Sequence, residues 1–318
     1  MSIDLRPYQS NLVDNTRLSL AGGKRRVVAY LPTGGGKTRT AAAIICRALA
    51  KGRKVVFVAN RKQLVLQTSG VLHGLGIAHG ILQADNTRNL DARVLVASID
   101  TVHLRGLPDD IGLIIIDECH SVAGSAKLKQ IMFSRNLVPV IGLTATPFAA
   151  GMAKHYKELG GALFEDLVIG ATVADLIADD YLVDCDIYAP SEPDMKGVRS
   201  SKSIDGETDF RQSDLAKAVD KPSLIGDIRD HWFRLARGKQ TAVFATDIAH
   251  SKHIVETFQA ADVTAEHIDY RMTDDERAAI LERFANGATT VLSNCALLSE
   301  GWDCPTAEVM VLARPTRS

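Results

Sequence analysis

The stretch Pro32-Thr33-Gly34-Gly35-Gly36-Lys37-Thr38 follows an apolar run, Val27–Leu31, and precedes a helix-forming stretch, Thr38–Ala50. Glycines let backbone N–H groups approach phosphate oxygens, the lysine reaches the β- and γ-phosphates, and the threonine hydroxyl can bind Mg²⁺. The positive end of the following helix would face the same phosphates. The strict pattern G-x-x-x-x-G-K-[ST] needs glycine where this chain has Leu31. The strand–loop–helix order still predicts a nucleotide-binding loop that comprises Thr33, Gly34, Gly35, Gly36, Lys37 and Thr38.

A second motif, Asp117-Glu118-Cys119-His120, comes directly after the apolar run Leu113–Ile116. A carboxylate at the end of a buried strand is well placed to reach a metal, so we expect Asp117 to hold Mg²⁺ directly or through water. The neighbouring Glu118 is expected to orient and deprotonate the attacking water. With Lys37, these two carboxylates predict a catalytic site for ATP hydrolysis.

The first half of the chain alternates strand-like and helix-like segments. The strand-like segments are rich in Val and Ile and almost unbroken in hydrophobicity, which is typical of parallel strands buried on both faces. Their alternation with helices predicts a doubly wound α/β lobe. The expected strands are Val27–Leu31, Lys54–Ala59, Val94–Ala97, Leu113–Ile116 and Val140–Leu143, and the expected helices are Arg6–Ser19, Lys37–Ala50, Lys62–Leu72 and Ser125–Asn136.

The pattern changes near residue 183. Ser191–Asp214 is polar and has little periodicity, so residues 184–221 are expected to be a linker or exposed excursion between a first lobe, residues 1–183, and a partial second lobe, residues 222–318. The expected helices of the second lobe are Pro222–Arg237, Asp247–Ala260 and Thr273–Ala285, the last opened by a capping box. Its expected strands are Gln240–Ala245, Ala265–Ile268, Thr290–Ser293 and Glu308–Ala313.

The charge is unevenly distributed, although the net charge of the 318 residues is only −1. Between Asp14 and Asp85 there is no acidic residue, whereas Lys and Arg recur throughout. Such a stretch can create a local positive field, or it can simply provide a soluble surface. The five cysteines form no C-x-x-C pair, and there is neither a secretory signal nor an apolar run of about 18 residues. We therefore expect a cytoplasmic protein without a zinc ribbon, disulfides or a membrane span.

Together these motifs resemble those of superfamily 2 helicases and translocases, which consist of two RecA-like lobes. Leu5–Gln9 resembles the family's Q-motif, in which the glutamine recognises adenine, and Pro32–Thr38 and Asp117–His120 resemble motifs I and II. Thr144–Pro147 resembles motif III, which links hydrolysis to nucleic-acid movement. Four further segments resemble, in order along the chain, motifs Ia, Ib, IV and V: Asn60–Leu64, Ala97–Thr101, Phe244–Thr246 and Ser299–Pro305.

The resemblance implies further site residues. Arg6 and Gln9 would bind the nucleotide from the first lobe, and Gly301 and Asp303 would bind it from the second. His120 would join the catalytic residues and couple them to Thr144 and Thr146. The implied nucleic-acid contacts are Asn60, Arg61, Gln63, Ser98, Thr101 and Thr246.

Aromatic and histidine residues leave alternatives open. Tyr8 could support adenine, and Phe148 and Trp302 could either stack on a base or pack against apolar neighbours. The histidines other than His120 show no spacing typical of a metal site.

The variant motifs narrow the resemblance to RadD-type repair helicases and the motor subunits of restriction systems. In this chain, motif III has the form T-A-T-P and motif Ia lacks P-T-R-E-L, and the resemblance therefore favours DNA over RNA as the partner. The DNA would be single-stranded or a duplex junction. The resemblance also allows a protein partner. Motif VI, Q-x-x-G-R-x-x-R, which would follow Leu312–Thr316, is not among the 318 residues. Its arginine fingers contribute about 10³–10⁵ in rate, and Arg314 and Arg317 lack its setting.

Two functions therefore remain open at this point. The first is an ATP-dependent DNA helicase or translocase. The second is a truncated ATP- and nucleic-acid-binding module with weak hydrolysis, which would need a partner or the motif VI arginines for motor activity.

Overall fold

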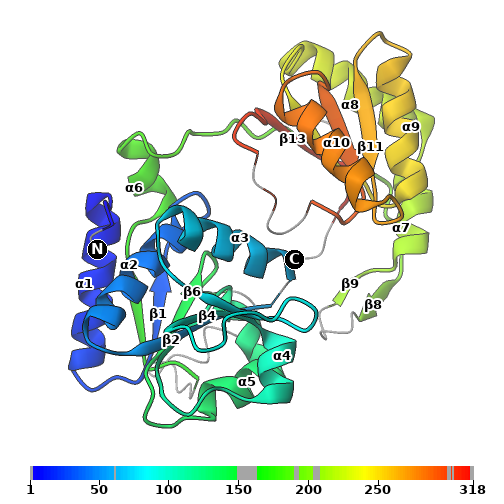
Figure 1. Ribbon diagram of the computed structural model, residues 1–318. Helices are drawn as coiled ribbons and strands as arrows, with labels where there is room; N and C mark the ends of the chain where they lie inside the picture. Colours follow the sequence, from blue (N-terminus) through cyan, green and yellow to red (C-terminus); the bar gives the residue numbers. More distant parts are fainter. Residues whose placement is uncertain are drawn as a thin grey trace. The chain divides into compact units, whose positions relative to one another are not determined.

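Seven parallel strands form one sheet in residues 1–185, and four parallel strands form another in residues 186–318, counted over the described residues (Figure 1). The computed structural model describes residues 3–60, 62–148, 163–189, 193–202, 208–298, 302 and 304–315. Within these ranges no helix combines the length and the hydrophobicity needed to cross a bilayer.

The first sheet has the strand order β3-β4-β2-β5-β6-β1-β7. Its strands are β1 (Arg26–Tyr30), β2 (Lys54–Ala59), β3 (Gly80–Leu82), β4 (Val94–Ser98), β5 (Ile111–Ile116), β6 (Val140–Thr144) and β7 (Asp166–Ile169). The helices of this unit are α1 (Pro7–Ala21), α2 (Lys37–Ala50), α3 (Lys62–Gly74), α4 (Ile99–Arg105), the 3₁₀ turn η1 (Cys119–Ala123), α5 (Ala126–Phe133) and α6 (Val173–Ala178).

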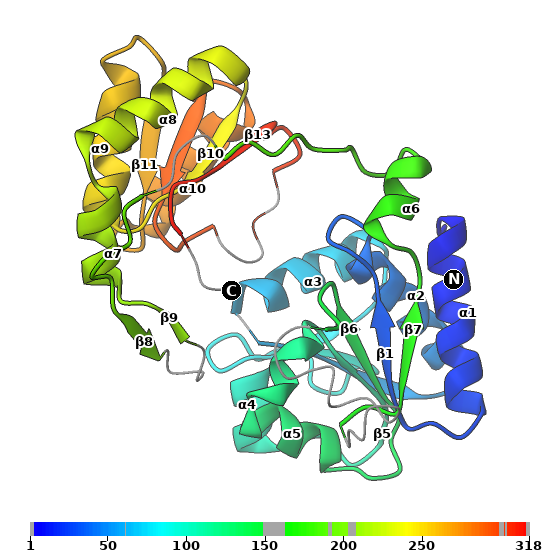
Figure 2. The same cartoon turned by 180° about the vertical axis from the view of Figure 1, so that it is seen from behind.

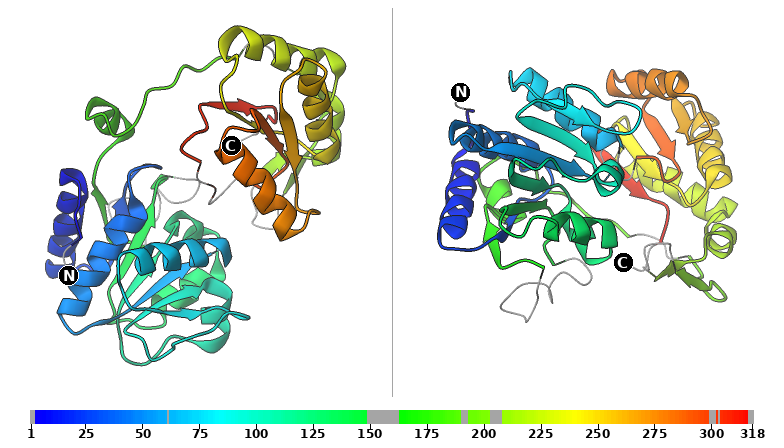
Figure 3. Two further views of the ribbon diagram at one scale, coloured as in Figure 1. Left: turned by 45° about the horizontal axis from the view of Figure 1, so that its top comes forward. Right: turned by 60° about the horizontal axis from the view of Figure 1, so that its bottom comes forward.

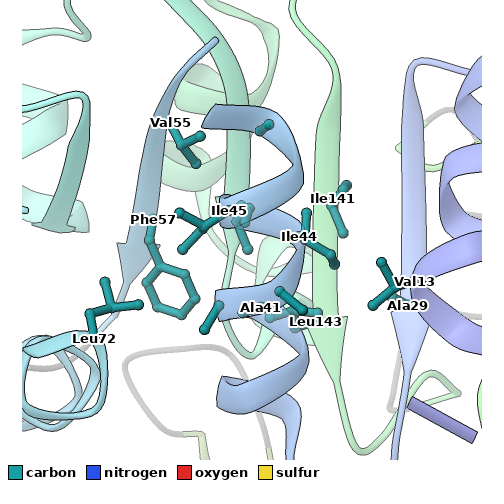
Figure 4. Close-up of a cluster of buried hydrophobic side chains, with 14 of the residues drawn as sticks. Val13, Ala29, Ala41, Ile44, Ile45, Val55, Phe57, Leu72, Ile141 and Leu143 are labelled. Atoms are coloured by element: carbon teal, nitrogen blue, oxygen red, sulfur yellow. The ribbon is translucent and has the colours of Figure 1, made fainter. Parts of the chain in front are cut away.

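Helices cover both faces of this sheet, which explains why its central strands are apolar on both sides. The α1, α2 and α3 helices pack on one face, and α4, η1 and α5 pack on the other (Figures 1 and 2). On the first face, Ile44 and Ile45 of α2 lie against Phe57 of β2 and Ile141 of β6 (Figure 4). Burying one such side chain contributes about 1.5–3 kcal/mol. This packing fixes α2, and with it the loop at its amino end.

The second sheet has the strand order β11-β12-β10-β13. Its strands are β10 (Thr241–Phe244), β11 (Ala265–Ile268), β12 (Val291–Asn294) and β13 (Val309–Leu312). The α8 (Pro222–Leu235) and α9 (Ile248–Gln259) helices pack on one face, and α10 (Asp274–Ala285) packs on the other (Figure 3). Thr273 caps α10 in a reciprocal pair of hydrogen bonds with Glu276. The predicted α/β fold with two parallel sheets is confirmed.

Several elements differ from the expectations. The expected linker, residues 184–221, contains the antiparallel strands β8 (Ser200–Lys202) and β9 (Thr208–Phe210) and the helix α7 (Gln212–Val219). Three apolar residues at helical spacing, Leu215, Ala218 and Val219, are buried and hold α7 in place. The polar composition of the surrounding stretch concealed this short amphipathic face. The strands β3 and β7 and the helices α4 and α6 are also additions, since they are too short to show a clear period.

Candidate active site

The loop between β1 and α2 adopts a conformation that requires glycine. Gly34 and Gly36 have φ angles of 79° and 82°, in the left-handed region, and Gly36 is the N-cap of α2. A Cβ atom on Gly34 would lie 2.8 Å from Leu182 Cδ2. A Cβ atom on Gly36 would collide with Gln9 Nε2. Backbone conformation and close neighbours therefore both disfavour a side chain at Gly34 and Gly36.

The predicted Q-motif lies against this loop. Tyr8 Oη and Gln9 Nε2 both donate hydrogen bonds to the carbonyl oxygen of Gly35, at 3.0 and 2.9 Å. Gln9 Oε1 accepts a 3.0 Å hydrogen bond from the backbone N–H of Arg6, and the side chain is buried. Both ends of the Gln9 amide thus hold the loop in shape, and its contact with adenine stays a prediction.

Tyr181 is a neighbour of this site that sequence reasoning missed. The Arg6 guanidinium carbon lies 4.3 Å from the centre of the Tyr181 ring, and Arg6 Nη1 donates to Tyr8 Oη at 3.2 Å. The Tyr8 and Tyr181 rings meet edge to face, 5.4 Å apart. Tyr181 follows α6, far along the chain from α1, and no motif surrounds it to reveal this contact.

The second motif forms a strained turn after β5. The Asp117 N–H donates a 2.9 Å hydrogen bond to the carbonyl oxygen of Val58 on β2, which continues the ladder of the sheet. The next residue, Glu118, has φ 45° and ψ 51°, and a non-glycine residue in this region costs on the order of 1–3 kcal/mol. This turn brings Glu118 Oε1 to 3.7 Å from Lys37 Nζ. The two predicted motifs therefore meet in one site.

His120 links this carboxylate to the predicted motif III. Its Nδ1 atom lies 3.3 Å from Glu118 Oε2 and 3.1 Å from Thr144 Oγ1, at the end of β6. Thr144 Oγ1 also accepts a 3.0 Å hydrogen bond from the backbone N–H of Thr146. The contacts run without a break from Lys37 through Glu118, His120 and Thr144 to Thr146.

The environment separates the acidities of the two carboxyl groups. Burial, reinforced by the charge of Glu118, raises the pKa of Asp117 to about 6, against the opposing effect of Lys37. Burial also acts to raise the pKa of Glu118, but the hydrogen bond with His120 and the charge of Lys37 outweigh it, so this pKa is lowered. Glu118 is thus kept ionised, as a base requires. The positive charge near Asp117 is too small to offset the effect of burial on its pKa.

These features fit a magnesium ion. A divalent cation beside Asp117 would offset the burial that raises the pKa of this carboxyl group. The oxygens of Asp117 and of the Thr38 hydroxyl are of the type that Mg²⁺ prefers, with phosphate oxygens and water completing its shell. Among the described residues, no cluster of three or more His, Cys, Asp or Glu side chains could hold a metal by itself. Asp117 and Thr38 are thus the residues that would hold Mg²⁺ at this site.

Cys119 has a structural place in the motif. It is fully buried, and burial raises the pKa of its thiol well above the usual value. A Cβ atom on Gly142 of β6 would lie 2.6 Å from the Cys119 sulfur, so the glycine makes room for it. Cys119 packs in the apolar core, whereas its neighbours Glu118 and His120 contact residues of the candidate active site.

The predicted nucleic-acid contacts of the first unit lie at or just after the carboxyl ends of β2 and β4. Gln63 is exposed in the first turn of α3, and Asn60 is half-buried with no hydrogen-bond partner for Oδ1 among the described residues. Ser98 and Thr101 are buried, and their hydroxyls hydrogen-bond each other at 2.8 Å at the start of α4. These two hydroxyls thus cap a helix. Arg61 lies outside the described residues.

In the second unit, Thr246 is buried after β10, and within the described chain its Oγ1 has no hydrogen-bond partner. Its carbonyl oxygen accepts a 3.0 Å hydrogen bond from Gln212 Nε2 of α7. Gln212 also lines a cavity of about 500 Å³ whose basic members are Lys252 and Arg271. Sequence reasoning missed this cavity, because its lining comes from segments without a common motif.

The remaining candidates of the second unit are the residues around the predicted motif V. Gly301 and Asp303 lie outside the described residues. Trp302 packs on Phe284 of α10, with ring centres 6.0 Å apart, which agrees with the packing alternative. Arg314 Nη2 forms a 2.7 Å ion pair with Asp209, and this contact gives the arginine a structural place.

The chain has two parallel-sheet units, and in the first a glycine loop and an acidic turn meet at Lys37 and Glu118. This arrangement is typical of a nucleotide-binding α/β protein. A family model described as type III restriction enzyme, res subunit, matches residues 2–149. The helicase conserved C-terminal domain matches residues 221–318. Together these two models cover most of the chain, and they support the resemblance to superfamily 2 helicases.

Similar proteins come from phage, yeast and bacteria. A 51.5 kDa protein of a Lactococcus phage is 28% identical over 90% of this chain and 58% of its own length. The Saccharomyces cerevisiae protein named as the ATP-dependent helicase IRC3 is 27% identical over 99% of this chain and 47% of its own length. The Escherichia coli type I restriction enzyme EcoAI endonuclease subunit is 26% identical over 98% and 42%, respectively. The chain spans about half the length of the curated relatives it matches.

Solved structures show the same fold. The Pyrococcus furiosus Hef helicase domain superposes with a TM-score of 0.55 at 17% identity, over 98% of this chain and 90% of the other. Saccharomyces cerevisiae Dbp5 bound to RNA and ADP BeF3 gives a TM-score of 0.58 at 15% identity, over 98% and 79%.

Proposed function

We propose that this chain is the motor of an ATP-dependent DNA helicase or translocase, which couples Mg-ATP hydrolysis to movement on DNA. The observation that carries the proposal is the continuous set of contacts from Lys37 to Thr146. It joins a phosphate-binding loop to a base, and the base to a loop at the end of β6.

Each residue has a distinct task in this proposal. The backbone N–H groups of the glycine loop and Lys37 Nζ bind the phosphates of ATP. Thr38 and Asp117 would hold Mg²⁺, which when bound neutralises charge on the phosphate oxygens. Glu118, kept ionised by His120 and Lys37, positions the attacking water and takes its proton.

His120 and Thr144 provide the coupling step. Because His120 Nδ1 contacts both Glu118 and Thr144, a change in charge at Glu118 alters the position of His120. Thr144 then transmits the change to the backbone N–H of Thr146. A chain of contacts that responds to the charge of Glu118 would be a physical basis for linking hydrolysis to a nucleic-acid contact.

Relatives that are subunits of restriction enzymes support DNA as the nucleic acid. Exposed Gln63 and the segments at the carboxyl ends of β2 and β4 are the proposed contacts in the first unit. They would bind mainly phosphates, and therefore with little sequence preference. Binding of single-stranded DNA should weaken steeply with salt. A flat salt response would contradict contact with the phosphate backbone.

The assignment is tested by Lys37→Ala, with exposed Lys217→Ala on α7 as the matched control. DNA-stimulated phosphate release should disappear in the first variant and persist in the second. Unchanged turnover in Lys37→Ala would overturn the assignment.

A second candidate is a module that binds ATP and DNA but hydrolyses ATP weakly without further residues or a partner. The observation that favours it is that the relatives are about twice as long as the chain. Phosphate release by this chain, with and without an extension past Ser318, distinguishes the two candidates. Strong DNA-stimulated turnover by the 318 residues alone would exclude the second.

A further inference from the structure

A cavity of about 550 Å³ lies in the first unit, at the edge of the sheet where the parallel strands begin. Its lining comes from the middle and end of α1, from the carboxyl-terminal half of α2, and from residues just before or within the first three positions of β1, β2, β5 and β6. The nucleotide loop lies at the opposite edge, because Lys37 begins α2 whereas Lys51 follows its last residue. Fourteen helical residues separate these positions by about 20 Å. The cavity is therefore distinct from the candidate active site.

The floor of this cavity is apolar. Val13, Ile44 and Ile141, which come from α1, α2 and β6, lie side by side (Figure 4), and Ala48 extends the surface along α2. The floor also contains Thr16, which is 1% exposed. Within the described chain, Thr16 Oγ1 has no hydrogen-bond partner. A buried hydroxyl without a partner costs about 1–3 kcal/mol, and a ligand with a polar atom would remove this cost.

The rim of the cavity is basic. Among the described residues, the lining contains no acidic residue and five cationic ones, all exposed: Arg17, Arg25, Arg47, Lys51 and Arg53. Of these five, only Arg47 forms an ion pair with a described residue, which is Asp14. That pair shows that the rim can accept a carboxylate. Leu137, which is 79% exposed, adds an apolar edge.

All five residues of the basic rim lie between Asp14 and Asp85, a stretch of the sequence without an acidic residue. A role in solubility alone does not explain why these cations surround an apolar cavity. An apolar centre with a polar rim is instead the usual anatomy of a protein-binding site. The volume also lies within the range of pockets that bury a ligand or an anchoring side chain.

We propose that this cavity binds an acidic segment of a partner protein. One large apolar side chain of the segment would occupy the floor, and flanking Asp or Glu carboxylates would pair with Arg17, Lys51 and Arg53. A nucleic acid fits the cavity less well, since its phosphates need no apolar floor and no described lining residue is an aromatic on which a base could stack. Charge complementarity therefore selects an acidic peptide.

The test uses random 12-residue peptides displayed on phage and selected on the immobilised 318-residue chain, with counter-selection on an Arg17→Glu/Arg53→Glu variant. We expect enriched peptides in which Asp or Glu flanks a Leu, Ile, Phe or Trp. Labelled synthetic copies should bind at least tenfold more weakly to this double variant, and also when their apolar anchor is replaced by serine. The matched control, Lys217→Glu on α7, should leave binding unchanged.

ATP turnover and DNA affinity are measured on the same double variant. The double variant should retain the ATP turnover and DNA affinity of the parent, because the cavity lies far from the nucleotide loop. Failure to enrich acidic peptides, or enrichment that the double variant does not reduce, would overturn the proposal. A loss of DNA affinity in the double variant, without selection of acidic peptides, would show that the surface binds nucleic acid instead.

Discussion

Glu118 Oε2 lies 3.3 Å from His120 Nδ1, and the same nitrogen lies 3.1 Å from Thr144 Oγ1. One imidazole thus contacts both the proposed base and the last residue of β6. The hydrogen bond with His120 also helps to lower the pKa of Glu118, against the effect of burial. This arrangement makes His120 the residue at which hydrolysis and nucleic-acid binding are expected to meet.

Replacing His120 by alanine should separate ATP binding from DNA-stimulated hydrolysis. A hydrogen bond to a charged group contributes about 1.5–3 kcal/mol, so stimulated phosphate release should fall by about tenfold to a hundredfold. Affinity for a fluorescent ATP analogue should change little. The acid limb of the pH–rate profile should move to higher pH, because the lost hydrogen bond no longer lowers the pKa of Glu118.

A His120→Gln variant is the control, because it retains an N–H donor, and it should keep more of the DNA stimulation than alanine. Equal stimulation by DNA in the parent and in His120→Ala would contradict the coupling role.

Two glycines with similar backbone angles separate the effects of conformation and of contact. Gly36 has φ 82° and faces Gln9, whereas Gly52 has φ 75° and nothing within 4 Å of the position that a Cβ atom would occupy. Alanine at either position should lower the free energy of unfolding by about 1–2 kcal/mol, the cost of the left-handed conformation. Only Gly36→Ala should also weaken nucleotide binding, measured by titration with a fluorescent ATP analogue, because its methyl group would displace Gln9 from the loop. Equal losses of nucleotide affinity at the two positions would contradict the proposed fit.

The pair of His253 and Asp220 predicts how the stability of the second unit depends on pH. The His253 Nδ1 atom lies 2.8 Å from Asp220 Oδ1, joining α9 to the end of α7. The hydrogen bond with Asp220 raises the pKa of His253 above its usual value of about 6.5. The stabilisation is therefore complete below about pH 6.5 and is lost as the pH rises through the raised pKa. Because the histidine is half exposed, it amounts to less than about 1 kcal/mol.

Urea unfolding of the parent and of His253→Gln tests this prediction. Both tryptophans of the chain, Trp232 and Trp302, belong to the second unit, so their fluorescence reports its unfolding. The difference in unfolding free energy should be largest near pH 6 and vanish at alkaline pH. A difference that grows with pH would have the wrong sign.

The long apolar strands could be predicted closely from the sequence. The β2 strand spans the predicted residues, Lys54–Ala59, and β1 begins and ends one residue before the predicted range. A nearly unbroken run of buried apolar residues marks such strands, because both faces are covered. The capping box at Thr273 likewise located the start of α10.

Long-range contacts could not be predicted in this way. The sequence places Lys37 at a helix start and Asp117 at a strand end, but it does not bring Tyr181 to Arg6 or Leu182 to Gly34. These contacts depend on how α6 packs after β7, an edge strand too short to show a period. Nor does a motif show that Ser98 and Thr101 hydrogen-bond each other in the cap of α4.

Glu118 is the proposed base of an ATP-hydrolysing site built around Lys37. The most direct test of this role is Glu118→Gln, which keeps the size of the side chain and removes its charge. We predict that the variant binds a fluorescent ATP analogue as the parent does, while single-turnover phosphate release with single-stranded DNA falls by about 10²–10⁴-fold. Phosphate release equal to that of the parent would show that Glu118 is not the base.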